Sequence, residues 1–179
     1  MQHLNESVAA NAQNVRRLIE QLAPPDIIIT AATTPPGDDD YQRRLRLWAA
    51  DCAARAVHLI TDEPKAYDDA VIAISAARLF ARHFVHDGVL ARFHCPPGSK
   101  LYREAERSAA SEARLAATLC AQPDVWRGAL GAVTHALRAI IVDSCEVFGL
   151  NAARSEVDWQ IARLLCWLSV PEPTDCPVD

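Results

Sequence analysis

Aromatic residues and glycine are scarce in this chain: aromatic side chains make up 6% of the sequence, and only 6 of its 179 residues are glycine. Half of the residues are nevertheless hydrophobic, so Ala, Leu, Val and Ile carry most of the apolar content. Ala and Leu are strong helix formers. The composition therefore predicts an all-α protein, and a chain of this length suits one domain with a sizeable core.

Positive charge is also in short supply. Lys and Arg together number 18 against 23 for Asp and Glu, which gives a net charge of −5. A protein that holds a phosphate backbone needs the opposite balance, so we expect no nucleic-acid partner. The run Arg43, Arg44 and Arg46 has no interleaved aromatic residues and follows three aspartates. We interpret it as a solvated helix face.

Paired cysteines and a leader segment are missing as well. None of the six cysteines forms a CxxC pair, and four of them lie in apolar helical stretches, where a free thiol behaves as a small core residue. This usage predicts a reducing, cytoplasmic location without disulfides. The first residues show no basic start followed by an apolar core, so no signal peptide is expected. The most apolar stretch, 128–150, contains Arg138, Asp143 and Glu146, which favours a buried helix over a membrane span.

Apolar residues at steps of three and four predict an irregular bundle of about six helices. The expected helices cover residues 5–22, 41–59, 64–88, 100–121, 125–148 and 151–170. We expect residues 1–37 to form an N-terminal helix and extended linker, 38–170 the bundle, and 171–179 a flexible tail. The helix over 125–148 is apolar around most of its circumference, so it is expected at the centre.

The sequence has no glycine-rich phosphate loop and no nucleophile elbow, and so no catalytic residue is predicted. The best candidate metal site is His83, His86, His94 and Cys95. The first two are three residues apart, and the following loop could bring the others toward them to give the four ligands that zinc prefers. The alternative is a set of surface histidines near a helix end. No cofactor is otherwise expected, and a metal-binding enzyme or sensor remains the alternative function.

Asp51 and Arg78 occupy similar positions at the edge of the apolar stripes of their helices. An unpaired carboxylate there would be costly to bury. We therefore expect an ion pair or hydrogen bond between the two helices, with a structural role or as part of a ligand or partner contact.

Three segments together resemble a known family. LWAADCA at 47–53 with Arg55, AISAARLFAR at 73–82 and DWQIARLL at 158–165 are similar to segments of a family of small helical bacterial immunity proteins. The resemblance implies binding and neutralisation of a toxin by direct protein contact, without catalysis. The residues carried over as binding candidates are Trp48, Asp51, Arg78, Trp159 and Arg163. The same residues could instead form an internal polar frame of the fold, which we favour.

Two further questions stay open at this point. An acidic chain could mask a basic toxin surface through charge-steered association. Alternatively, the chain could be a structural subunit of a larger helical assembly, with Trp126, Trp159 and Trp167 in an oligomer interface. The sequence leaves the oligomeric state and the identity of the partner undetermined.

Overall fold

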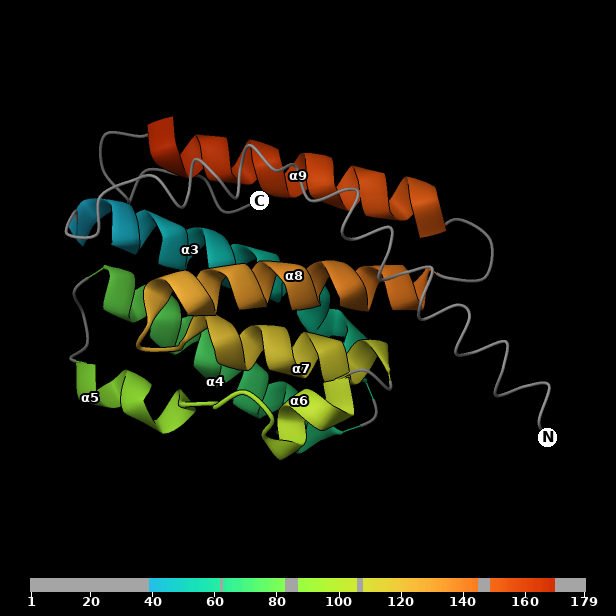
Figure 1. The fold of residues 1–179 in the computed structure, drawn as a ribbon, viewed down its shortest axis with the longest axis horizontal. Coiled ribbons are helices and arrows are strands. Elements are labelled where there is room, and N and C mark those ends of the chain that lie inside the picture. The colour runs from blue at the N-terminus through green and yellow to red at the C-terminus, as the bar shows by residue number, and fades with distance from the viewer. Residues whose placement is uncertain (1–38, 62, 83–86, 106–107, 145–148, 170–179) are drawn as a thin grey trace.

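The computed structural model describes residues 39–61, 63–82, 87–105, 108–144 and 149–169. Their seven α-helices confirm the all-α class, and this part of the chain contains no strand (Figure 1). The helices are α3 (Asp39–Ala56), α4 (Pro64–Ala81), α5 (Asp87–Leu90), α6 (Lys100–Ala105), α7 (Ala109–Cys120), α8 (Val125–Asp143) and α9 (Gly149–Ser169), with short 3-10 turns at Val57–Leu59 and Ala91–Phe93. The helix expected at 5–22, the linker that follows it and the tail over 171–179 lie outside the described residues.

The centre of the bundle is formed by α3 together with α8, the helix that the sequence predicted there. Every residue from 44 to 53 is buried, and α3 packs against α4, α7, α8 and α9. Helix α8 also packs against three helices, but Leu130 and Val142 on it are exposed. Figure 1 shows α9 lying along α3 and α8 on one side of the bundle, with α5 and α6 on the opposite side.

Helices α7 and α8 approach each other closely because small residues face each other. A Cβ atom added to Gly128 would lie 2.6 Å from the backbone oxygen of Leu119, and one added to Gly131 would lie 2.7 Å from Cδ1 of Leu119. Buried alanines fill the remaining contact, including Ala116 and Ala132. The distance between the axes of two packed helices depends on the size of the side chains between them. Small side chains at this contact therefore allow α7 and α8 to pack closely.

Two arginines of the run on α3 are buried and Arg43 is half-buried, so the interpretation of the run as a solvated face was wrong. Arg44 and Arg46 are 8% and 3% exposed. Arg43 Nε donates to the oxygen of Ala81 at 2.6 Å, and Arg44 Nη1 donates to that of Trp167 at 2.6 Å. Arg46 donates to the carbonyl oxygens of residues 120, 122 and 123. These oxygens lie at the C-terminal ends of α4 and α9 and at and just after the end of α7. Carbonyls at such ends lack intrahelical partners, and a cation is favoured there.

Several helix ends also differ from the expected bounds. The helix predicted over 100–121 is two helices, because the Ser108 side chain caps a new start by accepting from the Ser111 N–H at 3.1 Å. The helix that begins at Pro64 ends at Ala81, before the predicted stop at Gly88. The start of α8 agrees with the prediction: Asp124 accepts from the Arg127 N–H at 3.1 Å.

Among the described helices, α8 is long and apolar enough to cross a membrane by length and composition. The core helix of a bundle has the same properties. Its packing against α3, α7 and α9, with His135 buried on the inner face, is that of a core helix.

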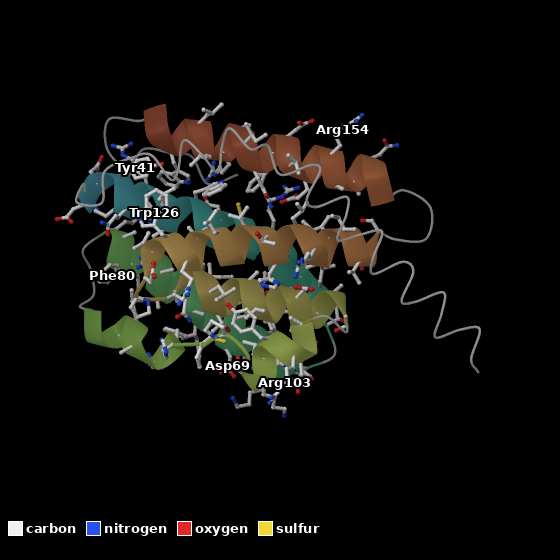
Figure 2. All side chains as sticks on the ribbon, in the orientation of Figure 1. Tyr41, Asp69, Phe80, Arg103, Trp126 and Arg154 are labelled. Atoms are coloured by element: carbon white, nitrogen blue, oxygen red, sulfur yellow. The ribbon has the colours of Figure 1, made fainter. Side chains whose placement is uncertain are left out.

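At the start of α8, Trp126 lies beside Tyr41 of α3 with the ring centroids 5.8 Å apart, and Phe80 lies at the same end of the bundle (Figure 2).

Candidate functional site

Asp51 on α3 is a buried carboxylate that binds side chains from two other helices. Its side chain is 6% exposed. Oδ1 accepts from Arg78 Nη2 of α4 at 2.7 Å, which confirms the predicted ion pair. Oδ2 accepts from Arg163 Nε at 2.7 Å and from Trp167 Nε1 at 2.9 Å, both on α9. One carboxylate therefore joins α3, α4 and α9.

The surroundings of Asp51 compensate for its burial. Burying a carboxylate is costly unless it is paired and hydrogen-bonded, and here each oxygen has at least one charged donor. The guanidinium of Arg163 also lies over the Trp167 ring, 5.5 Å from its centroid. The carboxylate is thus held in one position by three donors from two helices.

A second polar chain connects α3 to α9 beside the first. Trp48 Nε1 donates to the backbone oxygen of Gln160 at 2.8 Å, and Gln160 Nε2 donates to Oε1 of Glu156 at 3.1 Å. The other oxygen of Glu156 accepts from Arg55 Nε at 2.9 Å. The Arg55 guanidinium stacks over the ring of Trp159, 4.2 Å from its centroid. Together with the contacts of Asp51, these bonds form what we call the polar frame, made of residues 48, 51, 55, 78, 156, 159, 160, 163 and 167.

Glu156 is the most buried carboxylate of the polar frame, with 2% of its surface exposed. Burial raises the pKa of its carboxyl, while the charge and hydrogen bond of Arg55 and the hydrogen bond of Gln160 act in the opposite direction. Glu156 and Gln160 were not predicted as site residues from the sequence. The signal was available: both occupy positions of the inward stripe of α9, where a polar residue predicts a buried partner.

The thiols near the polar frame are protonated core residues. Burial raises the pKa of Cys52, the neighbour of Asp51, well above its usual range. Burial likewise raises the pKa of Cys120 to about 12. Cys52, Cys95, Cys120 and Cys166 are all free, and the first three are buried. Since the thiolate is the nucleophilic form, Cys52 and Cys120 are inert at neutral pH.

The three segments on which the family resemblance rests are the ones that meet in the polar frame. Asp51 comes from the segment 47–53, Arg78 from 73–82 and Arg163 from 158–165, and the last two residues bind the first. A family model described as "Imm-5 like putative immunity protein" matches residues 38–166, which is most of the chain. The chain belongs to this family. No curated protein and no solved structure matches it significantly.

The five binding candidates of this Imm-5 like protein differ in their access to solvent. Trp48 and Asp51 are 4% and 6% exposed, and the Arg163 side chain is 11% exposed. Arg78 is 29% exposed and Trp159 is half-buried. The first three face the interior, so they stabilise the fold. Trp159 and Arg78 reach the surface, together with Arg55, whose side chain is 43% exposed.

The proposed metal ligands are only partly within the described residues. His83 and His86 lie outside them. His94 is exposed, and Cys95 is buried with Sγ 3.2 Å from Ser99 Oγ. The part of the chain that the structure describes contains no group of three or more His, Cys, Asp or Glu side chains that could hold a metal. The four-residue cluster therefore stays a prediction.

A buried carboxylate–histidine pair was not predicted. Glu112 Oε2 lies 2.5 Å from Nδ1 of His135, and both side chains are almost fully buried between α7 and α8. The ring of Tyr102 meets His135 edge-on at 5.9 Å between centroids. The pair links α7 to α8 as an internal contact.

An open groove of about 570 Å³ lies between α4 and the segment 92–101, beside α7. Small residues of α4, such as Ala66 and Ala70, line it together with the segment 92–101. Arg114 stands at its edge but is held by Glu63 at 3.3 Å, and Lys100 is held by Glu104 at 3.4 Å. Arg92, which also lines the groove, donates to the backbone oxygen of Val89 at 3.2 Å and lies over the Phe93 ring. Three cationic side chains at the groove therefore already have contacts within the described part of the bundle.

Proposed function

We propose that this protein binds and neutralises a cognate toxin by direct contact, without catalysis. The observation that carries the proposal is membership of the Imm-5 like immunity family over residues 38–166. An immunity role requires a protein partner and a stable surface that fits it. The proposal does not require a reactive group.

The chemistry of the site supports binding over catalysis. Both oxygens of Asp51 and both oxygens of Glu156 are used by donors from within the bundle. A general acid or base must reach the proton that it transfers, and a nucleophile must be deprotonated. These carboxylates are enclosed, and the Cys52 thiol beside them is protonated. Their arrangement holds three helices in fixed positions, which prepares a rigid surface and lowers the entropic cost of association.

The exposed edge of the polar frame is the best candidate for the contact. Trp159 and Arg55 lie there as a stacked pair, and Trp and Arg are enriched among residues that dominate binding energy. Glu156 already neutralises Arg55. Contact at this point would therefore be governed by the Trp159 side chain more than by the charge of Arg55. The net charge of −5 on the whole chain would steer a basic toxin toward the protein.

We further propose that the protein acts in the cytoplasm. The four cysteines within the described residues are free, which is typical of a reducing compartment. Neutralisation there would protect the cell that makes the toxin, or a neighbour that receives it.

The test is co-expression with the product of the neighbouring gene. We expect that product to be toxic alone, and growth to return with stable co-purification of the two proteins. Trp159→Ala should weaken binding roughly tenfold or more. Leu165→Ala is the matched control, because this residue is 59% exposed on the same helix. If the neighbour is harmless and nothing co-purifies with the protein, the immunity function is wrong.

A further inference from the structure

The outer face of α4 carries an apolar stripe. Four of the seven exposed large hydrophobic residues among those described belong to α4: Tyr67, Val71, Ile72 and Leu79. Tyr67, Val71 and Leu79 form a row with Ser75 at steps of four, and residues four apart are neighbours on a helix surface. The opposite face of α4 is made of buried alanines that pack against α3 and α7. The helix is therefore apolar on both its inner and its outer face.

Charges flank this stripe symmetrically about Ser75. Asp68 lies seven residues before Ser75 and is exposed, and Arg82 lies seven residues after it as the C-cap of α4. Within the described residues, no ion pair joins either side chain to an opposite charge, and Nε of Arg82 is buried without a hydrogen-bond partner. Among the described residues, neither charge is thus paired with one of opposite sign.

This pattern is complementary to itself. When two α4 helices pack antiparallel and cross at Ser75, a two-fold axis through the crossing point pairs Asp68 of one copy with Arg82 of the other, and Val71 with Leu79. Each charged pair then lies about 10 Å from the crossing point, at 1.5 Å per residue. The small Ser75 side chain at the crossing point lets the two helices approach each other closely. A shallow crossing angle keeps Asp68 of one copy within contact distance of Arg82 of the other. A two-fold interface needs this kind of self-complementary face.

We propose that the outer face of α4 is a homodimer interface, in which two copies of this chain pack antiparallel about Ser75. The partner is a second copy because an antiparallel α4 places its Arg82 opposite Asp68 and its Asp68 opposite Arg82. One apolar contact is then accompanied by two Asp68–Arg82 pairs. This goes beyond toxin binding, since it uses α4 while the proposed toxin contact lies on α9 and at the end of α3. A contact made by one helix per copy is at the small end of stable interfaces, so the dimer depends on protein concentration.

The experiment measures dimerisation of the whole chain by sedimentation velocity over a wide concentration range. We expect Asp68→Arg alone, and Arg82→Asp alone, each to weaken dimerisation roughly tenfold or more, because each replaces two attractive pairs by two repulsive ones. A mixture of the two variants should dimerise again, and only as a heterodimer, since both pairs then have opposite charges. Asp158→Arg makes the same charge change at an exposed position of α9 and should leave dimerisation unchanged.

Two further measurements keep the result decisive. Helical circular dichroism establishes that each variant is folded, and Ser75→Trp, at an exposed position of the crossing, should abolish dimerisation without touching a charge. A wild-type chain that stays monomeric at high concentration overturns the proposal. So does a dimer that none of the α4 variants affects, or a mixture of the two charge variants that fails to associate.

Discussion

Trp48 on α3 donates its indole N–H to the backbone oxygen of Gln160 on α9 at 2.8 Å, and this bond is one of a series along the two helices. Arg44, Trp48, Asp51 and Arg55 follow one another at steps of four and three, so they share one face of α3. Arg44 binds the end of α9 at Trp167, whereas Arg55 binds Glu156 near its start. The helices are thus antiparallel and joined by polar contacts along their length, which fixes α9 in register.

Asp51→Asn tests how much the shared carboxylate contributes to stability. The substitution keeps the size of the side chain but removes the negative charge between Arg78 and Arg163. Removing one partner of a buried ion pair typically costs about 3–5 kcal/mol. We expect a loss of that order in the free energy of unfolding, measured by urea denaturation.

The control for this experiment is Asp69→Asn. Asp69 forms an ion pair with Lys65 at 2.7 Å, but both side chains are largely exposed. Exposed pairs contribute less than about 1 kcal/mol. Equal losses for the two variants would contradict the structural role of Asp51.

Glu156 predicts a specific dependence of stability on pH. Burial raises its pKa in the folded protein, so the folded state holds its proton more tightly than the unfolded state. Its contribution to stability is therefore fully present below the pKa of the unfolded chain and is lost as pH rises through the raised pKa. The free energy of unfolding of the native protein should thus fall relative to that of Glu156→Gln as pH increases. Urea unfolding from pH 4 to pH 8 measures this difference, and a difference that does not change with pH would count against it.

Much of the helical framework follows from periodicity. The starts near Asp39, Pro64 and Val125 are encoded by local acidic or proline residues, which the sequence shows directly. The Asp51–Arg78 pair could also be predicted, because each residue flanks an apolar stripe. In contrast, the break between α6 and α7 depends on Ser108 acting as a cap, and a serine within an Ala-rich stretch does not reveal whether it caps or continues a helix.

The rest of the site depends on contacts between distant residues. From the sequence, Arg46 is expected at the surface because arginine is usually exposed. Its burial is possible only because three carbonyl oxygens at and just after the end of α7 accept hydrogen bonds from its guanidinium. Those oxygens lie more than 70 residues away in the chain. Arg163 and Trp167 bind Asp51 across a still larger separation, of 112 and 116 residues. No local sequence pattern encodes such pairings, so the arrangement of the helices around α3 could not be predicted from the sequence.

Arg46→Met tests whether the buried arginine stabilises the end of α7. Methionine fills most of the space but donates no hydrogen bond, which leaves the oxygens of Cys120 and Gln122 without this donor. Hydrogen bonds from a charged group contribute about 1.5–3 kcal/mol, and we expect a loss of stability of at least that size. Thermal and urea unfolding measure it. Arg103→Met is the control, because Arg103 points away from the bundle and is exposed (Figure 2). A similar loss of stability in this control would contradict a specific role of the Arg46 hydrogen bonds.

Gly128 and Gly131 offer a matched test of the close packing between α7 and α8. Replacing glycine by alanine inside a helix normally stabilises it by about 1 kcal/mol. At Gly128 the new Cβ would meet the Leu119 backbone oxygen at 2.6 Å, which can move only if the helices separate. At Gly131 it would meet the end of the Leu119 side chain at 2.7 Å, which can rotate away. Gly128→Ala should therefore lower the free energy of unfolding by about 1–3 kcal/mol, as overpacking does, and clearly more than Gly131→Ala. Urea unfolding of both variants decides it: the reverse order would mean that the two helices do not pack as closely as the structure shows.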